Sequence, residues 1–135
     1  MAGFTPNEAE TLIGQLIFQR IHVDRDATLV MGLFTDAAPA ETITYATLTE
    51  PTGTGYAELV LTDASWSVTG GVASYTQQTF TGGAGGWTGS VQGYYIASVS
   101  AGGTARLIVI EVDSGGPYTI AEGATYKITP NITIS

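Results

Sequence analysis

Beyond Arg25 the chain is patterned with a period of two residues, in short segments broken by Gly, Pro and Asp. Such a period places alternate side chains on opposite faces of a strand, whereas a helix needs a period of 3.6. About eight or nine short strands fit the segments, a spacing typical of a sandwich or barrel. We therefore predict a single domain over residues 1–135, a mostly β, antiparallel, jelly-roll-like β-sandwich with one short N-terminal α-helix.

Several of the expected strands are rich in apolar residues. Arg106–Val112 is nearly all apolar, so we expect a central strand that is buried on both faces. Gly93 interrupts the strand Val91–Val99 and indicates a bulge or a close backbone approach. The other expected strands in this group are Thr28–Phe34, Ile43–Thr49 and Tyr56–Thr62.

The strongest local prediction is a hairpin around Gly70 and Gly71, which can adopt the positive φ angles of a two-residue turn. One face of this hairpin carries aromatic and apolar residues, and the other carries mostly hydroxyls. Aromatic cross-strand pairs of this kind stabilise a hairpin by up to roughly 1 kcal/mol. The expected register pairs Thr69 with Val72, Val68 with Ala73, Ser67 with Ser74 and Trp66 with Tyr75.

The last segment of the chain alternates cleanly between apolar and polar residues. Pro130 cannot donate a hydrogen bond to a neighbouring strand, so we expect an edge strand or a bulge at this residue. Tyr126, Ile128, Ile132 and Ile134 are predicted to face one way, and Lys127, Thr129, Asn131 and Thr133 the other.

A helix start is visible near the N-terminus. Thr5 and Glu8 match a capping box, and Pro6 suits the first helical position. The helix is expected from about Pro6 to Phe18, so that it spans about residues 5–18 with its cap. Its apolar stripe predicts packing on the sheet rather than a detached, partner-binding helix. The stripe consists of Leu12, Ile13, Leu16 and Ile17.

The charge balance excludes some partners. Twelve acidic residues face four basic ones, which gives a formal charge of -8. Nucleic-acid phosphates and anionic membrane surfaces would both repel such a chain. The longest apolar stretch, Leu107–Ile110, is too short to cross a bilayer. Residues Met1–Pro6 lack a positive start and a long apolar run, so we expect no secretion signal. We expect a chain that is made in a cytoplasm and stays soluble unless an assembly recruits it.

Residues that could carry chemistry are few. The chain has no cysteine and one histidine, His22, which lies close to Asp24-Arg25-Asp26. This group is expected to be a solvated turn, because a short D-x-D match is a weak metal motif. The Gly82–Gly86 loop lacks the Lys-Ser or Lys-Thr of a phosphate cradle and is expected to be a flexible surface loop. We predict no metal and no cofactor.

Acidic residues are scattered along the expected strands, so a glycosidase-like carboxylate pair stays open by count alone. Glu58, Glu111 and Asp113 lie on strands whose spatial neighbours the sequence does not reveal. Exposed charges on half-buried strands are the ordinary interpretation. No G-x-S-x-G elbow is present, and we predict that the chain is not an enzyme.

Aromatic residues raise a second class of function, since carbohydrate-binding sandwiches use aromatic platforms for sugar rings. Tyr94 and Tyr95 are adjacent and must point to opposite faces, so at most one can join a given platform. Trp87 fits the edge of the core and a partner contact equally well. Tyr118 is the fourth aromatic residue of this group.

The order of segments over nearly the whole chain resembles that of small structural proteins of tailed phages, in particular capsid decoration (cement) proteins. The expected helix comes first, and a Thr/Glu-rich stretch and a Gly-rich loop with Trp87 lie farther along. The segments that carry the resemblance are Met31–Thr35, Gly53–Ala57, Trp66–Val68, Gln78–Thr81, Val91–Tyr95, Pro117-Tyr118 and Ile128–Pro130.

The resemblance implies assembly on the surface of a virion and no chemistry. The implied partner is the major capsid protein, and proteins of this kind are commonly trimers at local three-fold positions of the shell. The alternative is a tail-fibre component that binds a receptor or a carbohydrate. Trp87, Tyr94, Tyr118 and Pro130 are the candidate interface residues. Many small contacts repeated around a closed shell would give avidity without any single strong contact.

Overall fold

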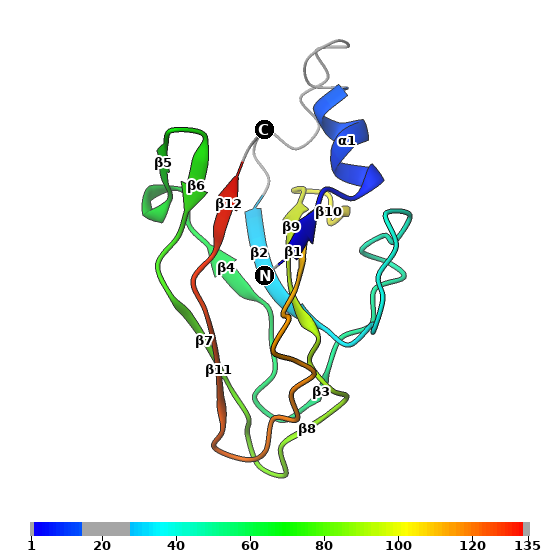
Figure 1. Cartoon of the computed structure of the whole chain (residues 1–135), viewed down its shortest axis with the longest axis vertical. Helices are drawn as coiled ribbons and strands as arrows, with labels where there is room; N and C mark the ends of the chain where they lie inside the picture. Colours follow the sequence, from blue (N-terminus) through cyan, green and yellow to red (C-terminus); the bar gives the residue numbers. More distant parts are fainter. Residues whose placement is uncertain (1, 15–27, 134–135) are drawn as a thin grey trace.

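The computed structural model describes residues 2–14 and 28–133, and this part of the chain is mostly β, with antiparallel sheets and one short α-helix (Figure 1). The predicted fold class is confirmed at this level. The largest sheet has five strands in the order β1-β10-β9-β2-β4. These strands are β1 (Ala2–Phe4), β2 (Thr28–Phe34), β4 (Leu59–Leu61), β9 (Gly93–Val99) and β10 (Ala105–Val112).

Strand β9 is the centre of this sheet. It pairs with β2 on one side and with β10 on the other, and its first six residues are buried. The sequence had pointed to Arg106–Val112 as the strand buried on both faces. That prediction is confirmed in part: β10 lies inside the sheet between β1 and β9, but only Leu107 and Ile110 are buried and the register shifts between Leu107 and Val109.

A long two-stranded ribbon packs on one face of the five-stranded sheet. One side of the ribbon is β6 (Val72–Ser74) followed by β7 (Gln78–Thr81), and the other is β11 (Thr125–Ile128) followed by β12 (Asn131–Thr133). β6 pairs with β12 and β7 pairs with β11, both antiparallel. Between its two halves, the backbone N–H of Tyr75 donates to the carbonyl of Pro130 at 3.0 Å. Pro130 therefore lies where the strand is interrupted, as its missing N–H predicts.

The predicted Gly70-Gly71 hairpin is confirmed with its register. β5 (Ser67–Thr69) pairs with β6, with Thr69 opposite Val72, and both turn glycines have positive φ angles of 60° and 77°. The rings of Trp66 and Tyr75 make an edge contact with centroids 5.1 Å apart. The cross-strand aromatic pair thus forms where the alternation of faces placed it.

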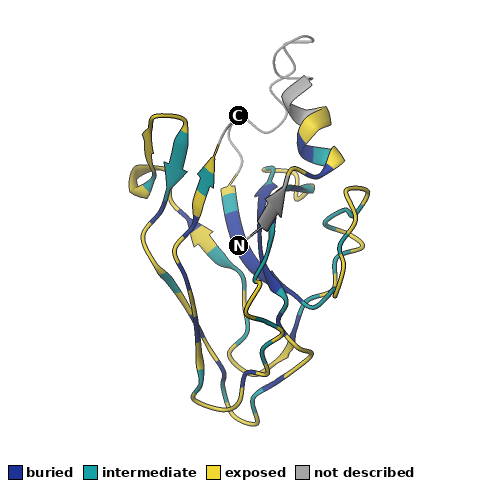
Figure 2. Ribbon diagram, viewed as in Figure 1, coloured by how far each residue is buried: buried dark blue, intermediate teal, exposed yellow. Residues whose placement is uncertain are grey.

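The core is divided by the sheet into two clusters. Figure 2 shows the buried positions along β2, in the middle of the molecule. On the ribbon side, buried residues of β2 and β9 meet those of the ribbon. On the opposite side, the segment 36–51 covers the sheet with Ile43, Tyr45 and Leu48. The ribbon-side cluster includes Met31, Leu33, Tyr94, Ile96, Phe80, Tyr126 and Ile128, and the other includes Val30, Phe34, Tyr95, Ala97, Leu107 and Ile110.

Helix α1 (Asn7–Gly14) begins close to the predicted start and contacts β10. The predicted end at Phe18 lies outside the described residues. Glu8 was expected to complete a capping box. Its Oε2 atom accepts hydrogen bonds from the backbone N–H of Leu107 at 3.0 Å and of Tyr45 at 3.2 Å. One carboxylate thereby joins the helix, the irregular point of β10 and the segment 36–51.

The prediction of a strand at Ile43–Thr49 is wrong. This segment forms turns, in which the N–H of Thr47 and of Leu48 donate to the carbonyl of Thr44. The expected strand Tyr56–Thr62 is confirmed only over β4.

Short elements complete the described part of the chain. β3 (Thr52–Gly53) pairs with β8 (Trp87–Thr88), and the 3-10 helix η2 (Asp63–Ser65) joins β4 to β5.

Candidate functional site

Three of the four predicted interface residues lie in the core. Trp87 is 6% exposed, donates from Nε1 to the carbonyl of Thr54 at 3.1 Å, and packs edge-on against the ring of Tyr56. Tyr94 is fully buried, and Pro130 is buried at the break of the ribbon. Their side chains are held inside the single chain, and this burial corrects the prediction that they are interface residues.

Tyr118 is the fourth predicted interface residue, and it is half-buried. Its ring packs against that of Tyr126 with centroids 5.4 Å apart. Tyr94 and Tyr95 point to opposite faces of β9, as predicted, and both are fully buried. An aromatic platform for sugars built on Trp87 and these two tyrosines is therefore not available on the surface.

The most unusual group in the described residues is a cluster of phenols and carboxylates around Tyr95, which we call the Tyr95 cluster: Tyr45, Glu50, Tyr56, Glu58 and Tyr95. The ring of Tyr95 lies across Gly32 of β2, where a Cβ atom would meet the phenol only 2.4 Å away. Glycine at this position lets the phenol reach past the neighbouring strand. Its Oη atom lies 2.5 Å from Glu50 Oε1 and 2.6 Å from Glu58 Oε1.

Two further phenols complete the Tyr95 cluster. Tyr45 Oη lies 2.8 Å from Glu58 Oε1, and Tyr56 Oη lies 2.6 Å from Glu50 Oε1. Tyr56 Oη also accepts from the N–H of Leu33 at 2.9 Å and lies 3.2 Å from its carbonyl oxygen. The described pairing of β2 with β4 ends at Met31. The hydroxyl of Tyr56 thus bonds the backbone of β2 at Leu33, beyond the point where the pairing of β2 with β4 ends.

Burial keeps these phenols protonated. Desolvation, followed by the hydrogen bond to Glu58, raises the pKa of Tyr45 to about 12. Desolvation is also the largest cause that raises the pKa of Tyr56 and of Tyr95, and the hydrogen bond to Glu50 comes next for both. A phenolate beside a carboxylate would add a second buried negative charge, so the neutral phenol is favoured.

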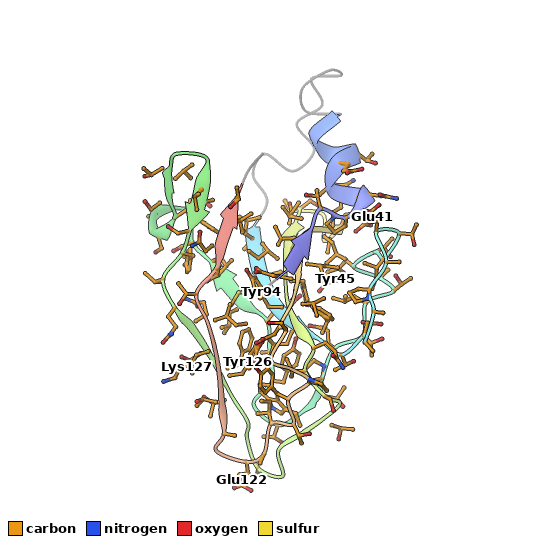
Figure 3. The ribbon with its side chains drawn as sticks, viewed as in Figure 1. Glu41, Tyr45, Tyr94, Glu122, Tyr126 and Lys127 are labelled. Carbon is orange, nitrogen blue, oxygen red and sulfur yellow. The ribbon has the colours of Figure 1, made fainter. Side chains whose placement is uncertain are left out.

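A second set of phenol–carboxylate pairs lies on the ribbon side of the sheet. Tyr94 donates to Glu111, its cross-strand neighbour, and Tyr126 Oη donates to Asp113 Oδ2 at 2.7 Å. Desolvation is the largest cause that raises the pKa of both tyrosines. Figure 3 shows Tyr94 and Tyr126 converging between the sheet and the ribbon, whereas Lys127 points outward.

These contacts show the spatial neighbours of Glu58, Glu111 and Asp113, which the sequence did not reveal. All three carboxylates accept hydrogen bonds from tyrosine hydroxyls. The arrangement fastens loops to strands through charge-assisted hydrogen bonds. Sequence reasoning missed it because the partners are far apart in the chain. The available signal was a composition of seven tyrosines beside twelve acids.

Other candidate groups have structural partners. The N–H of Gly85, in the Gly-rich loop, donates to Glu122 Oε2 at 3.2 Å, and Gly82 bonds the carbonyl of Ala124 at 2.9 Å. The N–H of Gly85 is therefore already bonded to a carboxylate. His22 and Asp24-Arg25-Asp26 lie outside the described residues. The described part of the chain holds no group of three or more His, Cys, Asp or Glu side chains that could bind a metal.

The surface offers apolar side chains on two edge strands. Val60 of β4 is 59% exposed and Val68 of β5 is 65% exposed. β4 is the last strand of the five-stranded sheet, and β5 is the last strand of its three-stranded sheet. Between them, Trp66 Nε1 is buried without a hydrogen-bond partner. Residues 60–68 thus combine open strand edges with exposed apolar groups, features that favour binding of another protein chain.

Comparison of the chain with protein-family models, with curated protein sequences and with solved structures finds no match. Among residues 2–14 and 28–133, no helix is long and apolar enough to cross a bilayer.

Proposed function

We propose that this chain is a non-catalytic structural protein that decorates and stabilises a phage capsid through non-covalent binding to the shell. The observation that carries the proposal is the exposure of Val60 and Val68 on edge strands. Exposed apolar groups beside unpaired strand edges are costly for a free monomer and useful in an interface. The segment resemblance to cement proteins names the partner, the major capsid protein.

The charge of the chain supports attachment through uncharged groups. Only four basic residues are present, and residues 59–69 contain Asp63 as their one charged side chain. Binding through backbone edges and valines depends weakly on salt, because salt mainly screens exposed charges. We propose a homo-oligomer, a trimer on the resemblance, located on the virion surface. We also propose that the five-stranded sheet and the ribbon are the two layers of a β-sandwich in which the second layer is small.

The test mixes the purified chain with undecorated shells, sediments the shells, and measures the bound fraction at several salt concentrations. We expect saturable binding with little salt dependence. Val60→Thr with Val68→Thr should weaken binding by roughly tenfold or more, since a buried valine contributes about 1.5–3 kcal/mol and tenfold corresponds to 1.4 kcal/mol. Thr79→Ser, on an exposed position of β7, is the matched control and should bind as the wild type does.

The result that would contradict this proposal is no co-sedimentation at any salt concentration. Saturable binding of the same preparation to a host-surface glycan would then support the alternative, a tail-fibre or receptor-binding module. Of the four aromatic residues considered for sugar binding, Trp87, Tyr94 and Tyr95 are buried and Tyr118 is half-buried, which favours the decoration protein over a sugar-binding module.

A further inference from the structure

The hairpin of β5 and β6 ends in an open strand edge. β5 (Ser67–Thr69) is the last strand of the sheet β12-β6-β5, and all of its residues are exposed. In Figure 1 the hairpin lies at the upper left, with β5 on the outer side of β6. Edge strands are commonly protected by lysine or proline, and β5 contains neither. The strand is therefore open to pairing with another chain.

The outward backbone groups of this edge belong to Val68. Thr69 and Val72 flank the two-residue turn at Gly70-Gly71, so they form the hydrogen-bonded pair that closes the hairpin. The next pair, Val68 with Ala73, is then of the non-hydrogen-bonded kind, whose N–H and C=O groups point away from the neighbouring strand. Val68 thus presents one donor and one acceptor to a strand that lies beside β5.

An apolar row crosses the same sheet and stops at this edge. Ile132 of β12 pairs with Ala73 of β6, and Ala73 pairs with Val68 of β5, so the three side chains share one face. Ile132 packs against the ribbon-side core and Ala73 is half-buried, whereas Val68 is 65% exposed. A strand added to β5 would extend the row and cover Val68.

The charge distribution limits where two copies of the chain can meet. Residues 64–105 contain no Asp, Glu, Lys, Arg or His, although the chain has a formal charge of -8. β12 (Asn131–Thr133) is also uncharged, so the whole three-stranded sheet carries no charged side chain. Two copies repel each other through acids elsewhere in the chain. The hairpin edge lets them approach without placing like charges opposite each other.

We propose that β5 pairs with β5 of a second copy of this chain, antiparallel and about a two-fold axis at Val68. In this register Val68 lies opposite Val68 of the second copy and exchanges two backbone hydrogen bonds with it, and Ser67 lies opposite Thr69. The sheet becomes continuous between the copies, with one apolar row across both. The strand is its own matching partner in this register, and the register places no charge in the contact.

The inference deepens the proposed function and rests on it only for the place of the contact on a virion. It assigns the β5 edge to a second copy and leaves the β4 edge, with Val60, for the shell. Because the contact is two-fold, a trimer on the shell would join its copies through another surface. Paired copies bind a repeating shell with avidity, so Val68 contributes to attachment through the pair.

Sedimentation velocity of the purified chain, without shells, tests the contact over a wide range of concentrations. We expect a concentration-dependent change from 14.0 kDa to twice this mass. Val68→Lys and Val68→Glu should each weaken the association by roughly tenfold or more, because like charges would then lie opposite each other in the contact. Val60→Lys, the same change at the exposed valine of β4, is the matched control and should associate as the wild type does.

A mixture of the two charged variants tests the two-fold geometry. Equal amounts of Val68→Lys and Val68→Glu should form a heterodimer, because residue 68 then meets the opposite charge, and a variant that failed to fold would not do so. The proposal is overturned by a monomeric wild type, by an association that either Val68 variant leaves unchanged, or by a mixture no stronger than the single variants. Monomers that still co-sediment with shells would refute the pairing of β5 and leave the proposed function intact.

Discussion

Gly32 is the residue on which the Tyr95 cluster depends most directly. A Cβ atom at this position would lie 2.4 Å from the Tyr95 phenol, and that ring is held on both sides by carboxylates. Alanine usually stabilises a strand by about 0.5–1 kcal/mol relative to glycine. At Gly32 the clash outweighs this gain, so alanine is expected to destabilise the chain. The Tyr95 ring is fully buried and bound at its hydroxyl, so it has no free space into which to move.

We expect Gly32→Ala to lower the free energy of unfolding by about 1–3 kcal/mol, the usual cost of overpacking a core. Urea unfolding measures the change. Gly102→Ala is the control, because the nearest heavy atom to its Cβ position is Ser100 Oγ at 3.9 Å, and its stability should match the wild type within about 0.5 kcal/mol. Equal stability of both variants would show that Tyr95 does not lie across Gly32.

Trp87 is important for the stability of the chain. Its ring is buried against Tyr56, and its Nε1 bonds the carbonyl of Thr54. Trp87→Ala should lower the free energy of unfolding by about 3–5 kcal/mol, as large-to-small core changes do. Trp87→Phe keeps most of the buried area and should cost less. Loss of shell binding by Trp87→Ala with unchanged stability would instead restore the surface-anchor interpretation.

At the scale of the elements, Glu8 holds three parts of the fold together. Its Oε2 atom accepts from Leu107 in β10 and from Tyr45 in the segment 36–51. Leu107 is fully buried, so its N–H cannot be satisfied by water when the carboxylate is removed. The cost of leaving one buried donor unpaired is about 1–3 kcal/mol.

Glu8→Ala should therefore lower stability by about 1–3 kcal/mol and speed the amide hydrogen exchange of Leu107 and Tyr45. Glu10→Ala, at an exposed position of the same helix, should leave both exchange rates unchanged. If the two variants exchange alike, α1 is not fastened to the sheet through the Glu8 carboxylate.

The elements that the sequence predicted are those whose determinants are local. The Gly70-Gly71 hairpin was predicted with its register, because two glycines set the turn and alternation sets the faces. Ile43–Thr49 failed although its residues favour strands. Glu8, some 37 residues away, binds the N–H of Tyr45, and the Thr47 hydroxyl binds the N–H of Thr44. One backbone donor of this segment is bonded by a distant carboxylate and another by a hydroxyl of the segment itself, and periodicity does not reveal such contacts.

The same reason explains why the Tyr95 cluster was not predicted. Its members come from the segment 36–51, from the residues before β4 and from β9, and the chain places Tyr95 45 residues from Glu50. The sequence did show that Tyr94 and Tyr95 face opposite ways. It did not show which carboxylates each would meet, because that depends on how two layers pack on the sheet.

For the whole molecule, the buried tyrosines make the folding stability depend on pH in the alkaline range. Desolvation raises the pKa of Tyr45 to about 12 and raises those of Tyr56, Tyr94, Tyr95 and Tyr126 as well. Their unfolded value is about 10. The folded state therefore binds more protons than the unfolded state above pH 10, and stability must fall as pH rises through that range.

We expect the tyrosinate absorbance of the native chain to rise in two stages. Tyr75, whose pKa is lowered by its hydrogen bond with the Thr62 side chain, should ionise early. The tyrosines whose pKa values desolvation raises should ionise together in a steep step well above pH 10, when the chain unfolds and phenols that cannot ionise singly inside the fold are released into water. The same chain in concentrated urea should titrate smoothly near pH 10. Tyr75→Phe should remove the early stage and leave the steep step, whereas a native titration that already follows the urea curve would contradict the burial of the phenols.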